Sequence, residues 1–322
     1  MTFKQKIYQL ARSLGLGRAL LNVRHLMDLG LFNFLKVAIF FKKDLTAIKN
    51  FTPVPSQDGI EIHMLLNHRM VLEGGWAIYS FMYFSKRRCH PMIHNDGTLN
   101  AKDISFLKSL FPGIDIISRV DANREVIDAL EKKGFSRCAQ LRKNSILSLK
   151  LFDTIHYSRE KRLVILDSDV LFFKYPKEIL DSLDLKRSLV YFPDNGHRYI
   201  LNEEEMRSLL GRPCVAKLNS GVMTVSAKDV DWARIERYLS NPKFWNGDGT
   251  GNYYSEQTLW AMELTHAEAM ILPEEEYPIC TPNPSELAIV AAHYCGSAYW
   301  KSMLHTRAIP YLRRQLIKSS QG

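Results

Sequence analysis

Two aspartates that directly follow a run of four apolar residues are the strongest chemical signal in this sequence. The run Leu163–Leu166 predicts a strand covered on both faces, so that Asp167 and Asp169 would lie at its carboxyl end. Open α/β sheets bind their ligands at that end of the strands. Two carboxylates in this position can bind one hard cation, Mn²⁺ or Mg²⁺, which can bridge to a diphosphate.

Two polar segments farther along the chain could bind a ligand at the same edge. Asn219-Ser220-Gly221 predicts a small turn that opens onto an apolar strand. Its asparagine and serine can hydrogen-bond to hydroxyl groups, and its glycine permits a close backbone approach. Ser255-Glu256-Gln257 begins a helical pattern, in which the serine is a candidate N-cap.

A histidine near the C-terminus is a candidate for the third metal ligand. His293 follows the apolar run Leu287–Ala292, which places it at another predicted strand end. Imidazole is a common metal ligand and suits Mn²⁺ together with carboxylates. Gly296 and Lys301 could then meet phosphate groups through a backbone N–H and an ammonium group.

Alternating strand and helix patterns around these residues predict an α/β fold with a largely parallel sheet. Strands are expected at Ile60–Leu66, Pro91–His94, Ile114–Ile117 and Arg162–Val170, and helices at Gly75–Phe84, Lys102–Leu110, Arg124–Lys133 and Leu141–Tyr157. A segment with two prolines and no periodicity, Asn50–Gly59, separates this region from what precedes it. We therefore expect a basic helical extension and linker over 1–57, a main domain over 58–301 and a basic C-terminal helix over 302–322.

The charge is concentrated at the two ends of the chain. The chain has 322 residues and a net charge of +9, but residues 1–50 contain nine Lys or Arg against Asp28 and Asp44. Residues 301–322 contain five basic side chains and no acidic one. This distribution does not indicate a nucleic-acid-binding body. Basic amphipathic helices at the ends could lie on an anionic membrane surface, or could instead pack on the domain with their charges in water.

The cysteine pattern and the hydropathy favour a cytoplasmic protein, which could be membrane-peripheral. Five scattered cysteines without CxxC spacing predict reduced thiols rather than a disulfide framework or a zinc site. No apolar stretch reaches the roughly 20 residues that a membrane span needs. The N-terminus also lacks the apolar segment of a signal peptide.

The polar segments, taken in their order, resemble the GT-A glycosyltransferases, and those of family 8 most closely. The resemblance covers about residues 60–301 and implies a Rossmann-like, mixed but mostly parallel sheet. It implies a nucleotide-sugar donor, of which a UDP-sugar is the expected form, and Mn²⁺ or Mg²⁺ held by Asp167, Asp169 and His293. The expected reaction moves the sugar, with retention, to a glycan, a glycolipid or another hydroxyl acceptor, and the acceptor partner is expected to be a glycan or a lipid-linked molecule.

The resemblance also implies a role for each remaining candidate. Asn219, Glu256 and Gln257 match catalytic positions near the donor sugar. Asn67 matches the region that contacts the nucleoside, and Lys150 stands where the family often has an arginine. The donor-contacting set is expected to comprise Asn67, Lys150, Ser168, Ser220, Gly221, Gly296 and Lys301. In this chain Trp300 precedes Lys301 and no proline follows, which departs from the family's usual ending.

Two other functions are compatible with the sequence. A buried strand that ends in Asp-x-Asp is also found in haloacid-dehalogenase-type phosphatases, in which Asp167 would be the nucleophile. That reading needs a downstream acid for Mg²⁺, for which Asp248 is the candidate. The second alternative is a non-catalytic protein that retains the fold. For a transferase, the stretch Trp245–Tyr254 is a candidate acceptor loop.

Overall fold

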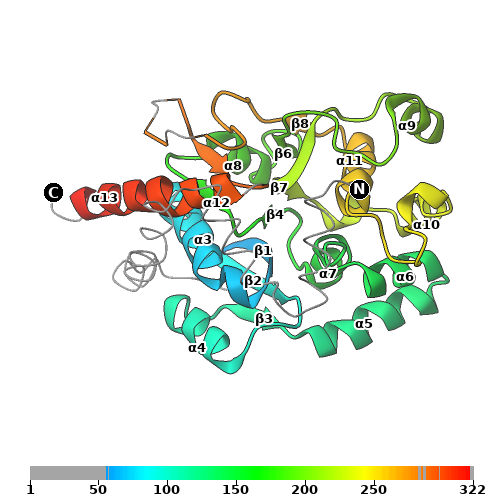
Figure 1. Cartoon of the computed structure of the whole chain (residues 1–322), viewed down its shortest axis with the longest axis horizontal. Helices are drawn as coiled ribbons and strands as arrows, with labels where there is room; N and C mark the ends of the chain where they lie inside the picture. The colour runs from blue at the N-terminus through cyan, green and yellow to red at the C-terminus, as the bar shows by residue number, and fades with distance from the viewer. Residues whose placement is uncertain (1–55, 57, 282–283, 286–287, 297, 320–322) are drawn as a thin grey trace, which may run out of the picture.

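A computed structural model describes residues 56, 58–281, 284–285, 288–296 and 298–319 of the chain. The expected basic helix over residues 1–49 and most of its linker lie outside the described residues. The described part is an α/β domain in which helices lie on both sides of a central sheet (Figure 1).

The central sheet is mixed and mostly parallel, as expected. Among the described residues, seven strands form it in the order β3-β2-β1-β4-β7-β6-β8, which Figure 1 shows from bottom to top. Its strands are β1 (Ile60–Leu66), β2 (Cys89–Asn95), β3 (Asp115–Ile117), β4 (Leu163–Leu166), β6 (Val190–Pro193), β7 (Leu218–Val225) and β8 (Met270–Ile271). β1 to β4 pair in parallel, β7 runs antiparallel to both β4 and β6, and β8 is parallel to β6.

The helices cover two hydrophobic clusters, one on each face of the sheet. In β4, Val164 and Leu166 belong to one cluster, and Leu163 and Ile165 belong to the other. This alternation follows from the two-residue period of a strand, and it explains why the whole run is apolar. The longer helices are α3 (Val71–Ser85), α4 (Ala101–Leu110), α5 (Arg119–Lys132), α6 (Ser136–Asn144), α7 (Leu149–Tyr157), α8 (Lys177–Leu183), α9 (Glu203–Leu210), α10 (Trp232–Tyr238) and α11 (Ser255–His266). Short 3₁₀ turns lie at η2 (His68–Met70), η3 (Ala227–Asp229) and η4 (Pro242–Phe244).

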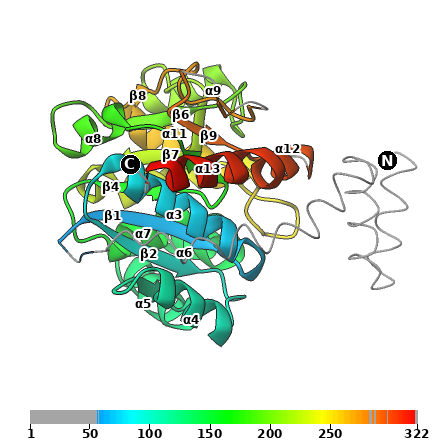
Figure 2. The same cartoon turned by 90° about the vertical axis from the view of Figure 1, so that its left-hand side faces the viewer.

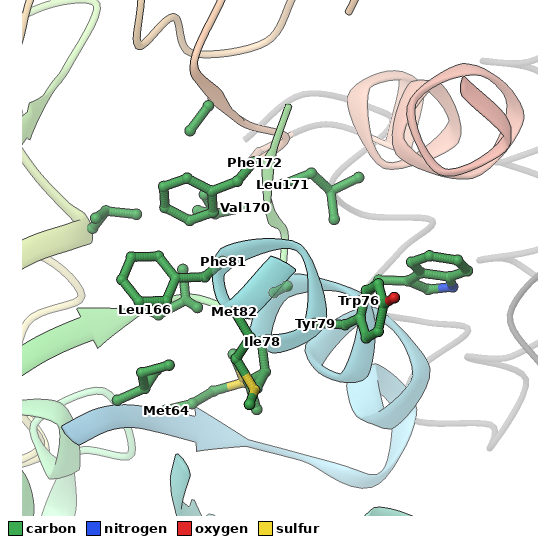
Figure 3. Close-up of a cluster of buried hydrophobic side chains, with 14 of the residues drawn as sticks. Met64, Trp76, Ile78, Tyr79, Phe81, Met82, Leu166, Val170, Leu171 and Phe172 are labelled. Atoms are coloured by element: carbon green, nitrogen blue, oxygen red, sulfur yellow. The ribbon is translucent and has the colours of Figure 1, made fainter. Parts of the chain in front are cut away.

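Helix α3 links the sheet to a second, smaller pair of strands. Trp76 and Phe81 are fully buried on α3, and the ring of Phe81 packs edge-on against Phe172 with centroids 5.1 Å apart (Figure 3). Phe172 belongs to β5 (Val170–Phe172), which pairs antiparallel with β9 (Ala291–His293). This packing places β5 in the same hydrophobic cluster as α3 and β4.

The single strand expected over Arg162–Val170 is therefore wrong. The chain leaves the central sheet after Leu166, turns through Asp167–Asp169 and enters the second sheet at Val170. Four apolar residues on each side of the acidic turn make the two strands look continuous in the sequence. The turn is closed by a hydrogen bond from the Val170 amide to the Asp167 carbonyl, 3.3 Å long.

The single helix expected over Leu141–Tyr157 is also wrong, because the chain forms α6 and α7 with a break at residues 145–148. The Ser148 hydroxyl donates to the carbonyls of Leu141 and Ser145, at 3.0 and 2.7 Å, in place of continued helical bonds. A neighbouring loop fills the break, since a methyl group on Gly251 would lie 3.1 Å from the Ser145 Cβ. The break gives α7, and hence Lys150, a direction independent of α6.

The C-terminal helices pack on the domain, on the same side as α3 (Figure 2). α12 (Ala298–Met303) continues through a π-helical turn, η5 (Leu304–Ala308), into α13 (Ile309–Ser319). Leu304, Leu312 and Leu316 are buried in the cluster that α3 also lines. The described apolar face of this segment is thus covered by protein, which is the second of the two alternatives considered above. Among the described helices, none has the length and apolar character needed to cross a membrane.

Candidate functional site

The two aspartates and the C-terminal histidine meet where the two sheets separate. Asp167 and Asp169 lie in the turn between β4 and β5, and His293 ends β9, paired with Val170 of β5. The Tyr294 amide donates to the Asp169 carbonyl at 2.9 Å, which fixes the two segments together. One ligand atom from each of Asp167, Asp169 and His293 lies within 4.8 Å of the other two. Residues 124 positions apart are therefore brought together by the pairing of β5 with β9.

An asparagine and a glycine of β7 orient the imidazole ring of His293. His293 Nδ1 lies 2.8 Å from Asn219 Oδ1, and Nε2 lies 3.0 Å from Asp169 Oδ1. If Nδ1 donates to the amide oxygen, Nε2 presents its lone pair to the aspartates, as a metal-binding histidine requires. The ring lies close against Gly221, because a methyl group there would be 2.5 Å from His293 Cε1.

The polar segment that contains these residues is a bulge inside a strand, so the expected turn at Asn219–Gly221 is wrong. β7 continues from Leu218 to Val225, but its register against β6 shifts between Tyr191 and Phe192. A bulge re-aims side chains locally and often occurs beside functional sites. On its other edge β7 keeps a regular register with β4, and the Gly221 carbonyl there accepts from the Asp167 amide at 2.7 Å.

Two lysines compensate the charge of the two aspartates. Lys150 Nζ lies 2.8 Å from Asp167 Oδ1, and Lys301 Nζ lies 2.7 Å from Asp169 Oδ2. Burial opposes ionisation of Asp169, but His293 and Lys301 hold the pKa of its carboxyl well below the usual value. Burial likewise opposes the charge of Lys150, but Asp167 and Glu256 raise the pKa of its ammonium group. Asp169 and Lys150 are therefore ionised at neutral pH.

A buried glutamate lies beside this charged group. Burial, with a further contribution from Asp167, raises the pKa of Glu256 to about 7 against the opposing effect of Lys150. Its Oε2 accepts from the Ser220 hydroxyl at 3.0 Å, and that hydroxyl accepts from Lys150 at 3.0 Å. Its Oε1 is buried without a hydrogen bond, 3.8 Å from Lys150 Nζ. Ser255, the expected N-cap of this helix, is instead its first residue and donates to the Phe244 carbonyl.

These side chains line a pocket of about 580 Å³ at the carboxyl end of β4, a volume suited to a small-molecule ligand. Of the residues singled out in the sequence, the pocket brings together Lys150, Asp167, Asp169, Asn219, Ser220, Glu256, Gln257, His293, Gly296 and Lys301. Gly296 has a positive φ of 88°, which permits the sharp turn that follows β9.

Three of the candidates do not line this pocket. Asn67 ends β1, and its side chain accepts from the Arg69 amide at 2.9 Å to cap η2. Ser168 is the half-buried middle residue of the acidic turn. Gly221 lies behind the imidazole of His293, and what approaches it closely is that ring.

The pocket also contains residues that the sequence analysis did not select. Asp194 follows β6, and its Oδ2 accepts from Asn219 at 3.2 Å and from Gln257 at 3.4 Å. It directly follows the apolar run Leu189–Phe192 and one proline, so the signal that identified Asp167 could have found it. Arg198 and Tyr253 lie on loops that lack such a signal.

The donor set fits a divalent cation of the hard or borderline type. Two carboxyl groups and one imidazole converge, with one ligand atom from each within 4.8 Å of the others, and Asn219 orients the imidazole. Oxygen and imidazole ligands without a thiolate are typical of Mn²⁺ and Mg²⁺ sites. Among the described residues, this is the single group of three such ligands.

Comparison with known proteins identifies the fold. The sequence matches no model of a known protein family and no curated protein. The apo structure of the bifunctional glycosyltransferase WbbM matches with a TM-score of 0.50 and 11% identity, over 82% of this chain and 53% of that chain. This chain therefore spans about half of that protein.

Two smaller solved structures match over most of their own length. The apo form of mouse xyloside xylosyltransferase 1 has a TM-score of 0.48 and 11% identity, over 73% of this chain and 97% of that chain. The galactosyltransferase LgtC, solved with donor and acceptor sugar analogues, has a TM-score of 0.48 and 13% identity. The match covers 80% of this chain and 96% of that chain. The chain has the GT-A glycosyltransferase fold that the sequence resemblance implied.

Proposed function

We propose that this GT-A-fold protein is a metal-dependent glycosyltransferase. It moves a sugar from a nucleotide-diphosphate sugar, by preference a UDP-sugar, to a hydroxyl group of an acceptor. The observation that carries this proposal is the convergence of Asp167, Asp169 and His293 in a pocket that also contains two lysines. This combination suits a diphosphate leaving group, because a metal cation and further positively charged side chains can neutralise the negative charge that develops on it.

We assign parts of the pocket to the metal ion and to the diphosphate according to the charges of the lining side chains. Asp167, Asp169 and His293 hold Mn²⁺ or Mg²⁺, which when bound neutralises charge on the diphosphate. Lys301 is half-buried at the entrance and can move from Asp169 to a phosphate oxygen, as an ammonium group on a flexible stem allows. Lys150 is buried between Asp167 and Glu256 and holds both carboxylates in place.

The sugar is proposed to lie toward Asn219, Glu256 and Gln257. These side chains and Asp194 form a connected set of amide and carboxyl groups, which can hydrogen-bond to sugar hydroxyls. Glu256 lines the pocket, and its carboxyl group can stabilise positive charge that develops at the anomeric carbon. Transfer with retention is part of the proposal.

The remaining donor contacts are proposed by position in the fold. Asn67 lies at the carboxyl end of β1, where a nucleoside can bind beside β4. Ser220 and Gly296 line the pocket that the diphosphate and the sugar would occupy, and Ser168 and Gly221 each adjoin a residue that lines it.

The phosphatase alternative is less well supported by the geometry. Asp167 is ion-paired with Lys150, and Asp248, the candidate second acid, lies in an exposed loop where it accepts from the Thr250 hydroxyl at 2.6 Å. Asp248 does not line the pocket.

A donor panel tests the proposal. Purified protein is mixed with UDP-, GDP- and ADP-sugars, with and without Mn²⁺, and the Tm and the free nucleotide are measured. We expect Mn²⁺-dependent stabilisation and slow hydrolysis with one donor, and loss of hydrolysis by at least about 100-fold in Asp169→Ala. Asp128→Ala, which removes an exposed acid outside the pocket, is the matched control. A fully active Asp169→Ala protein contradicts the metal assignment, and phosphate release from a simple phosphomonoester without any donor response favours the phosphatase.

A further inference from the structure

The lining of the pocket divides into a buried floor and an exposed rim. Asp169, Asn219 and Glu256 on the floor are buried and take part in the metal-ligand and hydrogen-bond network. Arg198 and Tyr253 line the same pocket but are exposed. Because the proposed donor and its cation occupy the floor, an acceptor has to approach across the rim. The residues of the rim are therefore the ones that would contact the acceptor and determine which acceptor binds.

Arg198 brings an uncompensated positive charge to the rim. The other two strong cations of the pocket are paired, Lys150 with Asp167 and Lys301 with Asp169. Asp194, the remaining aspartate of the lining, is satisfied by the amide groups of Asn219 and Gln257. The guanidinium of Arg198 has no ion pair or hydrogen bond to any described residue, although Gln257 fixes its backbone by donating to its carbonyl at 3.2 Å. Five donors on a positioned backbone are thus left for a ligand.

Tyr253 brings an aromatic face to the same rim. Its side chain is 71% exposed, and it contacts the ring of Tyr254 edge-on, with centroids 5.0 Å apart. The loop that presents it is held by hydrogen bonds, including one from the Asn252 amide to the Phe244 carbonyl at 2.8 Å. An exposed aromatic ring on an ordered loop at a pocket mouth provides an apolar surface on which the C–H face of a sugar ring can pack.

We propose that the acceptor is a saccharide that carries an anionic group, either a phosphate or a carboxylate. The sugar ring packs on Tyr253, and the anionic group binds the guanidinium of Arg198, which suits the bidentate geometry of both anions. This inference names the acceptor class of the proposed glycosyltransferase and rests on that function.

Direct binding of simple sugars to the protein loaded with Mn²⁺ and UDP tests the inference without turnover. The probes are methyl glucoside, methyl glucuronide and glucose 6-phosphate, with the corresponding galactose series, titrated by calorimetry. We expect at least one acidic sugar to bind about 10-fold more tightly than its neutral counterpart. The two acidic probes distinguish a carboxylate acceptor from a phosphate acceptor.

Matched variants assign the effect to the two rim residues. Arg198→Gln should abolish the preference for the acidic sugar, whereas Arg88→Gln, which changes an exposed arginine outside the pocket, should retain it. Tyr253→Ala should weaken the binding of neutral and acidic sugars by the same factor, whereas Tyr253→Phe should leave their binding unchanged. Affinity for Mn²⁺ and UDP should stay unchanged in all four variants.

Each remaining outcome contradicts a distinct part of the argument. Equal binding of neutral and acidic sugars, or a preference that persists in Arg198→Gln, overturns the anionic acceptor. Binding of none of the sugars by a protein that binds Mn²⁺ and UDP overturns it as well. A wild-type protein that binds neither Mn²⁺ nor any of UDP, GDP and ADP refutes the proposed function itself, and this failure is visible before any sugar is added.

Discussion

At the scale of single residues, the absence of a side chain at Gly221 determines where the imidazole of His293 can lie. This glycine occupies the bulge of β7 and leaves the space in which the imidazole of His293 lies. Asn219, two residues earlier, accepts from the Gly221 amide at 2.9 Å and orients the same imidazole. The geometry of the third metal ligand is therefore set by β7, a strand that contributes no ligand of its own.

Gly221→Ala should weaken metal binding without removing a ligand. The new Cβ would lie 2.5 Å from His293 Cε1 and 2.7 Å from Asn219 Oδ1, so the imidazole and the amide that orients it have to shift from their present positions. We expect the affinity for Mn²⁺, measured by calorimetry or by the spin-resonance signal of the free ion, to fall by about 10-fold or more.

The control for this variant is Gly196→Ala, because a Cβ at residue 196 meets no atom within 4 Å. Equal Mn²⁺ affinity in the two variants would show that the close contact at residue 221 does not position His293. A loss of Mn²⁺ binding in both would instead indicate a general effect of the glycine substitutions.

At the scale of elements, the candidate ligands could be found from the sequence, whereas their common location could not. Asp167, Asp169 and His293 each follow an apolar run, and a side chain just beyond a buried strand points to a ligand-binding edge. The pairing of β5 with β9 is a long-range contact that no local pattern encodes. The expected strand over Arg162–Val170 was wrong for the same reason, since periodicity cannot show that a chain changes sheets.

The break between α6 and α7 was missed because its cause is not local. Residues 141–157 have a continuous helical pattern, but Ser148 bonds back to Leu141 and the loop at Gly251 fills the space. β1 at Ile60–Leu66, which has a strong local signal, was predicted with correct bounds. Tertiary packing decided the remaining boundaries.

A pair of buried histidines on β1 and β2 should make the stability of the fold depend on pH. His63 Nδ1 lies 2.9 Å from His94 Nε2 in the layer between the sheet and α7. Burial lowers the pKa of His63, against the opposing effect of Glu61. Burial, with His63 and Arg142, lowers the pKa of His94 further. Both rings are therefore neutral in the folded protein at neutral pH.

The unfolded chain takes up protons on these residues below their ordinary pKa of about 6.5, and the folded protein does not. The free energy of unfolding should therefore have its full value above that pH. It should decrease as the pH falls through that value, by up to about 1.4 kcal/mol per pH unit for each histidine. Urea unfolding between pH 7.5 and 5.5 measures this slope.

His94→Gln should reduce the slope, because it removes one of the two buried rings. Equal slopes in the wild type and in His94→Gln would mean that the buried ring does not control the acid sensitivity. The overall stability of His94→Gln is not the readout, because any change at a fully buried position can lower it.

At the scale of the whole molecule, the C-terminal helices join the metal site to the core. Lys301 on α12 pairs with Asp169, and a turn later the same helical segment begins to pack into the cluster lined by α3. His305 also pairs with the buried Glu73 of α3 at 3.0 Å. The basic charge near the C-terminus therefore belongs to a helix whose described apolar face is already covered.

Leu312→Asp should accordingly destabilise the whole domain. Leu312 is fully buried against the α3 cluster, and the change removes apolar contacts and buries a charge without a partner. We expect a loss of about 3 kcal/mol or more, seen as a decrease in Tm of roughly 6–12 °C for a domain of this size. Arg314→Glu, an exposed change two residues away on the same helix, should shift stability by no more than about 0.5 kcal/mol. If both variants have the same Tm as the wild type, the helix does not pack on the domain. Its apolar face is then free to bind an anionic membrane, and sedimentation with acidic vesicles would detect this binding.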